Sequence, residues 1–145
     1  MKKDRKNIIL QSLASMLEDR NLSKITTALL AEKSGITEAA LYRHFPSKRS
    51  IYAELFSFCD DAIFAKCNEL KKNKMSAKDK TKNAFIFFMM FVEKNKGFAR
   101  LLSREALSTN EQNVSDNVNQ FYERFELILR QILKEDAANL TTQPG

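Results

Sequence analysis

The chain contains a single histidine, His44, which lies in the stretch TEAALYRHFPSK at residues 37–48. A catalytic histidine needs a nucleophile or a metal, and a partner that orients its ring. The sequence has no glycine-rich phosphate loop and no paired metal-ligand motif, and no further Cys or His accompanies Cys59 and Cys67. We therefore expect no enzyme, no cofactor and no metal site. We interpret the histidine as a side chain at a helix end that forms hydrogen bonds with backbone groups or with phosphate. The alternative is a histidine that is only packed against its neighbours.

Helices are the elements that must position this stretch, because a chain with three glycines and two prolines has few turn residues. Apolar spacing predicts an amphipathic helix over about residues 4–20. A short helix follows at residues 28–33, with Thr26 and Thr27 as N-terminal caps. Gly35 then suits a left-handed turn. Two short helices joined by such a turn have the layout of a helix-turn-helix.

The second short helix is predicted to begin at a Thr37 cap and to stop before Pro46, whose ring disfavours helical geometry in the preceding residue. Its exposed residues would be Thr37, Glu38, Tyr42 and Arg43, which suit phosphates and base edges. Simple capping, a half-buried ring and an ordinary solvated charge are the alternatives for Thr37, Tyr42 and Arg43. Ser47 is expected to cap a longer helix that reaches about residue 72.

The net charge of +6 is concentrated at the N-terminal end. Residues 1–50 hold ten Lys/Arg against five Asp/Glu, whereas residues 96–145 hold six against seven. A basic N-terminal third favours a polyanionic partner, either nucleic acid or an anionic membrane surface. The longest apolar run has nine residues, from Ala84 to Val92, and a membrane span needs about 20. We therefore expect no signal peptide and no membrane span, and a cytoplasmic protein.

The stretch ITTALLAEKSGITEAALYRHFPSKRSIY at residues 25–52 resembles the DNA-binding region of the TetR family of regulators. The matching positions are Thr26-Thr27, Leu30-Ala31, Gly35-Ile36, Leu41-Tyr42, His44-Phe45 and Lys48. The resemblance implies an all-α, TetR-like helical bundle. It also implies a three-helix helix-turn-helix DNA-binding domain at residues 1–50 and a helical regulatory or partner-binding domain at residues 51–145.

The family resemblance implies that this region binds palindromic double-stranded DNA as a homodimer, with the second motif helix in the major groove. Thr37, Glu38 and Ala39 would approach the bases, while Tyr42 and Lys48 match family positions that contact phosphate. The full set of candidate DNA contacts is Thr26, Thr27, Thr37, Glu38, Ala39, Tyr42, Arg43, His44 and Lys48.

The likeness extends to FYERFELILRQILKE at residues 121–135. In this segment the chain resembles those members of the family that act in nucleoid occlusion. It implies a nucleoid-associated protein that, when bound to DNA, binds the C-terminal tail of the tubulin-like division protein FtsZ. Division-ring assembly over the chromosome is then inhibited. The matching groove residues are Phe58, Lys66, Phe87, Met90, Lys94 and Asn95. Met90 stands where a glycine would make more room, so the depth of the groove stays open.

Three alternatives remain at this stage. The apolar helix around residues 84–92 is expected to be buried in the bundle core, and the groove is the more specific interpretation. A ligand-responsive TetR-type transcriptional repressor would instead surround a small molecule with these aromatic residues, and a plain protein-interaction bundle would need no DNA.

Because the sequence stops at Pro144-Gly145, we expect it to lack the last two helices of a TetR-like protein, which leaves dimerisation open.

Overall fold

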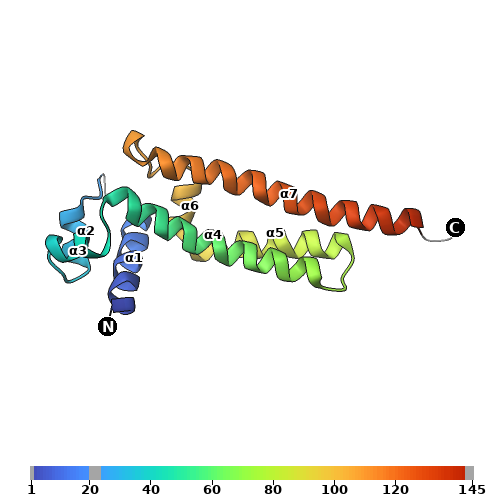
Figure 1. Ribbon diagram of the computed structural model, residues 1–145, viewed down its shortest axis with the longest axis horizontal. Coiled ribbons are helices and arrows are strands. Elements are labelled where there is room, and N and C mark those ends of the chain that lie inside the picture. Colours follow the sequence, from blue (N-terminus) through green and yellow to red (C-terminus); the bar gives the residue numbers. More distant parts are fainter. Residues whose placement is uncertain (1, 20–23, 143–145) are drawn as a thin grey trace.

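The computed structural model describes residues 2–19 and 24–142, with burial and side-chain contacts for residues 5–19 and 24–135. All regular structure in these residues is helical, so the predicted all-α class is confirmed. Three helices, α1 (Lys2–Glu18), α2 (Thr27–Lys33) and α3 (Glu38–His44), cluster at one end of an elongated bundle (Figure 1).

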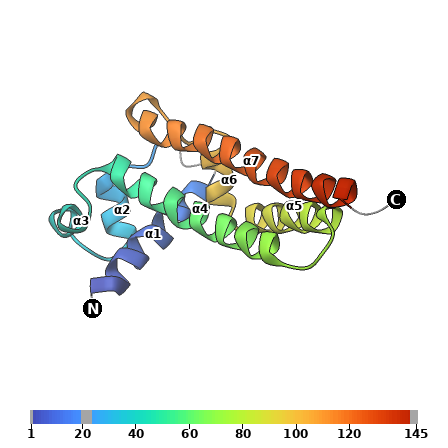
Figure 2. The same ribbon diagram turned by 45° about the vertical axis from the view of Figure 1, so that its right-hand side comes forward.

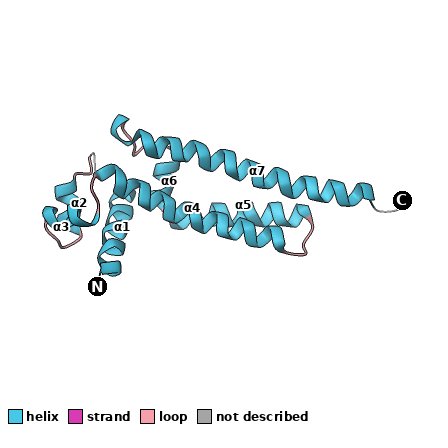
Figure 3. Cartoon of the chain, in the orientation of Figure 1, coloured by secondary structure: helices cyan, strands magenta, loops and turns pink. Residues whose placement is uncertain are grey.

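Three long helices form the body of the molecule. Helix α4 (Lys48–Lys72) leaves the three-helix cluster and α5 (Ala77–Lys94) returns beside it. The short α6 (Lys96–Leu102) and a 3-10 turn, η1 (Thr109–Glu111), lead into α7 (Gln112–Thr142), which runs along α4 and α5 (Figures 1 and 2). Short loops join these helices (Figure 3). The Pro144-Gly145 end lies outside the described residues.

Local sequence features begin and end these helices as predicted, except that Thr27, predicted to cap α2 together with Thr26, is the first residue of that helix. Thr26, Thr37 and Ser47 each cap a helix, because their hydroxyls accept a hydrogen bond from the backbone N–H three residues later, at 3.1–3.2 Å. Gly35 adopts the left-handed conformation with φ of 71°. Helix α3 ends at His44, two residues before Pro46.

A cluster of aromatic rings around Phe121 of α7 forms the core of the body. Its ring centroid lies 5.3–6.2 Å from those of five phenylalanines on α4, α5, α6 and α7 itself: Phe56, Phe64, Phe88, Phe98 and Phe125. Contacts of this kind add about 0.5–1.5 kcal/mol per pair beyond the burial of apolar area. The cluster therefore holds the three long helices and the short α6 together.

Helix α5 is less buried than its sequence suggests. Ala84 is buried, and Phe88 packs against the rings of α7. The expectation of core burial is wrong for four large side chains, which are 44–67% exposed: Phe85, Ile86, Met89 and Met90. The reason is that α4, α6 and α7 contact α5 on one side only, so the opposite side of this helix faces solvent.

The three-helix cluster is fixed to the body mainly where α1 crosses α6. Gly97 is buried there, and a Cβ atom on it would lie 2.6 Å from the carbonyl oxygen of Ala14, so the two backbones are in direct contact. Arg100 of α6 donates from Nη1 to the carbonyl of Leu17 at 2.6 Å. These contacts set how the N-terminal helices are presented.

Candidate nucleic-acid interface and partner groove

Helices α2 and α3 are joined by a small hydrogen-bond network. The hydroxyl of Thr27 donates to the Glu38 carboxylate at 2.8 Å and shares a hydrogen bond with the Tyr42 hydroxyl at 3.1 Å. The network brings three of the candidate DNA-contact residues together at the start of α2. Because Glu38 accepts from Thr27, its carboxylate orients another side chain of the site as well as sitting in the first turn of α3.

The outward face of α3 carries most of the remaining candidates. Ala39, Tyr42 and Arg43 are exposed, with Tyr42 47% exposed, and they lie opposite the buried Leu41. His44 is half-buried in the last turn. A methyl group, a phenol and a guanidinium on one face can meet thymine methyls, phosphates and guanine edges.

Lys48 at the start of α4 has a protein partner that the sequence did not indicate. Its Nζ lies 3.4 Å from Oε1 of Glu111 and 5.6 Å from the centroid of the Tyr52 ring. The side chain of Lys48 is 31% exposed. Its role as a phosphate ligand stays a prediction. Phosphate would have to bind Lys48 beside the Glu111 carboxylate or displace that carboxylate.

Glu111 in η1 is a buried acid at the junction between the N-terminal helices and the body. Burial alone would raise its pKa, but hydrogen bonds from the hydroxyl and N–H of Ser108, together with the charge of Lys48, lower the pKa below its ordinary value. Burial, with a smaller contribution from Glu111, raises the pKa of Tyr52 to about 12. At neutral pH the junction therefore holds a charged Lys48–Glu111 pair beside a neutral phenol.

The candidate partner groove combines residues of α4 and α5. Lys66 of α4 places its Nζ 6.0 Å from the centroid of the half-buried Phe87 ring of α5. Asn95 ends α5 and donates from its side chain to the carbonyl of Phe91 at 2.8 Å. Met90 and Lys94 are exposed on the same helix. The structure thus offers apolar surface flanked by two lysines.

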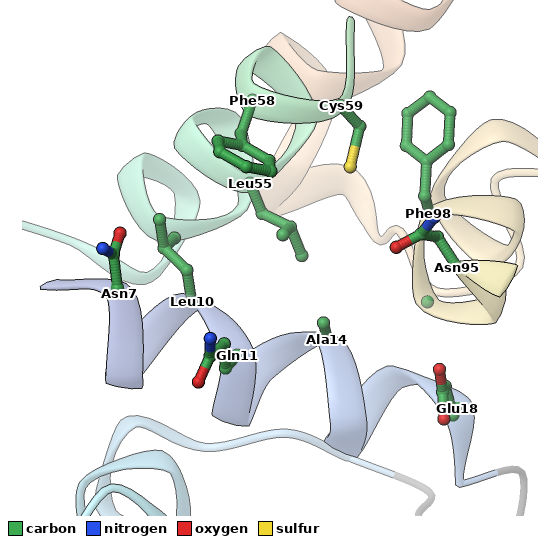
Figure 4. A pocket seen from close by; sticks show the side chains of 11 residues that line it. Asn7, Leu10, Gln11, Ala14, Glu18, Leu55, Phe58, Cys59, Asn95 and Phe98 are labelled. Carbon is green, nitrogen blue, oxygen red and sulfur yellow. The ribbon is translucent and has the colours of Figure 1, made fainter. Parts of the chain in front are cut away.

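Phe58 and Asn95, both predicted groove residues, also border a pocket of about 270 Å³ between α1, α4 and α6 (Figure 4). The Phe58 side chain is 67% exposed, so its ring is open to a partner. Residues of α1 also line this pocket, among them Leu10 and Ala14, and the sequence did not connect them to the groove. Spacing along the helix could not reveal them because the pocket is made by tertiary packing.

The cysteines are single buried thiols. Burial raises the pKa of Cys59 to about 12 and also raises the pKa of Cys67. Within residues 5–19 and 24–135, no group of three or more His, Cys, Asp or Glu side chains is placed to hold a metal ion. Over the described part of the chain, none of the helices has the length and apolar character of a membrane span.

Family models match both parts of the molecule. The model for bacterial regulatory proteins of the tetR family matches residues 9–55, which include the helix-turn-helix, and the model for a tetracyclin repressor-like C-terminal domain matches residues 78–142. A capped helix-turn-helix joined to a helical body defines a TetR-type DNA-binding regulator. The chain belongs to the TetR family of bacterial regulatory proteins.

Curated relatives give a more specific likeness. The chain is 40% identical over 135 residues to the nucleoid occlusion factor SlmA of Vibrio campbellii. The aligned region covers 92% of this chain and 69% of that protein. It is 39% identical over 133 residues to SlmA of Vibrio cholerae, covering 91% of the chain and 68% of the relative. The resemblance stated from the sequence is confirmed, and these relatives are longer than this chain.

Proposed function

We propose that the chain is a sequence-specific DNA-binding nucleoid occlusion factor. When bound to DNA, it binds the C-terminal tail of FtsZ and inhibits division-ring assembly over the chromosome. The observation that carries this proposal is the 40% identity to SlmA, because it extends over the helix-turn-helix and over most of the body. A likeness confined to residues 9–55 would have supported DNA binding alone.

The proposal divides the chain into a DNA-binding domain at residues 1–50 and a partner-binding domain at residues 51–145. The separate family matches at residues 9–55 and 78–142 support this division. Helix α4 would belong mainly to the second domain, and its first residue, Lys48, would link the two domains through its ion pair with Glu111 of η1.

DNA binding would place α3 in the major groove. Thr37, Glu38 and Ala39 would approach the base edges, and Arg43 would be a further phosphate ligand. Thr27 and Tyr42 would contact backbone phosphate while keeping their own hydrogen bond. Two copies would bind the two halves of a palindromic site, since one short helix contacts only a few base pairs. The positive N-terminal third would supply the non-specific attraction that holds the protein on the nucleoid.

The FtsZ tail would lie in the groove between α4 and α5. Lys66 and Lys94 would attract acidic residues of the tail, and Phe58, Phe87 and Met90 would receive its apolar side chains. A ligand-responsive repressor is the second candidate, and the pocket beside Phe58 is the observation that favours it.

Titration of a fluorescently labelled FtsZ tail peptide tests the proposal. Lys94→Glu should weaken peptide binding while leaving DNA binding intact, because it reverses one charge at the edge of the groove. Lys78→Glu, which makes the same change on an exposed position at the other end of α5, is the matched control and should have little effect. Equal peptide affinities for wild type and Lys94→Glu would show that the groove lies elsewhere.

A further inference from the structure

We propose that Glu38 is a specificity-determining residue that selects a cytosine in the DNA site, and that Thr27 is the positioning residue that holds its carboxylate toward the base. The inference rests on the proposed function and adds to it the chemistry of one base of the site. It starts from one arrangement, a chain of hydrogen bonds in which the hydroxyls of Tyr42 and Thr27 lead to the carboxylate of Glu38.

The direction of each hydrogen bond in this chain follows from the number of hydrogens available. A threonine hydroxyl has one hydrogen, and Thr27 donates it to Oε1 of Glu38 at 2.8 Å. The Tyr42 hydroxyl, 3.1 Å from the Thr27 oxygen, must therefore be the donor of the second bond. Both hydrogens point toward the carboxylate, so the chain holds Glu38 in place as a hydrogen-bond acceptor.

Glu38 lies where a recognition helix contacts bases. It is the first residue of α3, directly after the Thr37 cap, and its side chain is exposed. Glu38 and Tyr42 are four residues apart and therefore share one face of the helix. In helix-turn-helix proteins the N-terminal residues of this helix contact base edges in the major groove. The hydrogen-bond chain thus orients a carboxylate at a position that faces the bases.

The protein supplies no positive charge to this carboxylate. Among the residues whose contacts the structure describes, the ion pairs of the acidic side chains do not include Glu38. In a DNA complex the nearby phosphates would repel the carboxylate. Glu38 therefore favours DNA binding only where a base offers it a hydrogen-bond donor. Thr27 uses Oε1 alone, which leaves Oε2 to accept from that base.

The chemistry of the base edges then favours cytosine. In the major groove guanine presents the acceptors N7 and O6, and thymine presents the acceptor O4 beside its methyl group. Adenine has an N6 amino donor, but the N7 acceptor lies next to it. Cytosine presents its N4 amino group without a neighbouring acceptor on the same base. A side chain that only accepts hydrogen bonds is therefore best matched by cytosine.

The test measures base preference along a duplex that the full wild-type chain selects from a random pool. Each base pair of one half-site is replaced by the other three, and affinity is measured by fluorescence anisotropy. At one position wild type should prefer cytosine by about tenfold or more. Glu38→Ala should lose that preference and keep the preferences at the other positions.

Glu38→Gln makes a sharper prediction, because a glutamine amide can pair with both N6 and N7 of adenine. The preferred base at that position should change from cytosine to adenine. Glu32→Gln is the matched control, since it removes the same charge from an exposed side chain of α2. It should leave the base preference unchanged at every position, which separates a base contact from a general change in attraction to phosphate.

The positioning role of Thr27 is tested by two substitutions. Thr27→Val removes the hydroxyl and keeps the shape of the side chain, so the preference for cytosine should fall by about threefold or more at the Glu38 position alone. Thr27→Ser keeps the hydroxyl and should retain the wild-type preference. A merely structural role of Thr27 would instead weaken binding to all duplexes by the same factor.

The possible outcomes separate the two proposals. If wild type selects a duplex, and both Glu38→Ala and Glu38→Gln keep every base preference of wild type, the inference is overturned while the DNA-binding function stands. If Thr27→Val keeps the cytosine preference, the positioning role of Thr27 is overturned. If wild type selects no duplex, the DNA-binding part of the proposed function fails and the inference fails with it.

Discussion

Gly97→Ala is a sharp test of how the DNA-binding helices are fixed to the body. The added Cβ would lie 2.6 Å from the carbonyl oxygen of Ala14 and 3.2–3.3 Å from its Cα and carbonyl carbon. All three are backbone atoms, so no side chain can rotate away and α1 must move relative to α6. Overpacking of this kind costs about 1–3 kcal/mol.

Alanine also favours a helix by up to about 1 kcal/mol over glycine, which offsets part of this cost. The expected net loss in the free energy of unfolding is about 1–2 kcal/mol, or a fall of roughly 3–7 °C in Tm for a chain of this length. Urea unfolding followed by far-UV circular dichroism measures the loss. Ala14→Gly should not restore stability, because the clash involves the backbone of residue 14 and not its methyl group.

Gly35→Ala provides a comparison with a different physical cause. Its Cβ would meet no atom within 4 Å, but φ is 71°, where alanine is strained by about 1–2 kcal/mol. Gly35→Asn should therefore be milder than Gly35→Ala, whereas Gly97→Asn should be worse than Gly97→Ala. A neutral or stabilising Gly97→Ala would refute the close backbone crossing of α1 and α6.

The remaining predictions concern the junction and the DNA-facing residues. Glu111→Gln should lower the free energy of unfolding at pH 7 by about 1–2 kcal/mol, since it removes a charge-assisted contact with Lys48. Because folding lowers the pKa of Glu111, its contribution is complete above the ordinary value of 4.5 and is lost as pH falls through the lower folded value. Urea unfolding of wild type and Glu111→Gln over this range should therefore converge in acid, and a constant difference would contradict the charged pair. Lys48→Ala should weaken binding to all duplexes similarly and reduce the salt dependence of DNA binding. Thr37→Ala should instead alter which duplex sequences the protein prefers. Titration of several duplexes at two salt concentrations checks this, and the same effect of both changes on every duplex would contradict the division of roles.

Features encoded by a few neighbouring residues could be predicted from the sequence. The Thr37 and Ser47 caps, the left-handed Gly35 and the end of α3 before Pro46 depend on local backbone preferences. The spacing of apolar residues along α7 also predicts that one side of this helix is buried, and that side includes Phe121.

Contacts between distant residues could not be predicted in this way. Lys48 and Glu111 are separated by more than sixty residues, and Thr27 meets Glu38 only because the glycine turn sets the angle between α2 and α3. The exposure of Met89 on α5 depends on how many helices surround it, which an apolar run does not specify. The pocket beside Phe58 likewise exists only once α1 is docked against α6.

The most direct test of the central claim is a titration of labelled FtsZ tail peptide with and without a palindromic duplex selected by this chain from a random pool. We expect a duplex to be selected, the DNA-bound protein to bind the peptide, and Lys94→Glu to remove that binding while the duplex stays bound. Selection of a duplex with no peptide binding in either state would contradict the division-inhibitor function and leave a TetR-type DNA-binding protein of another role.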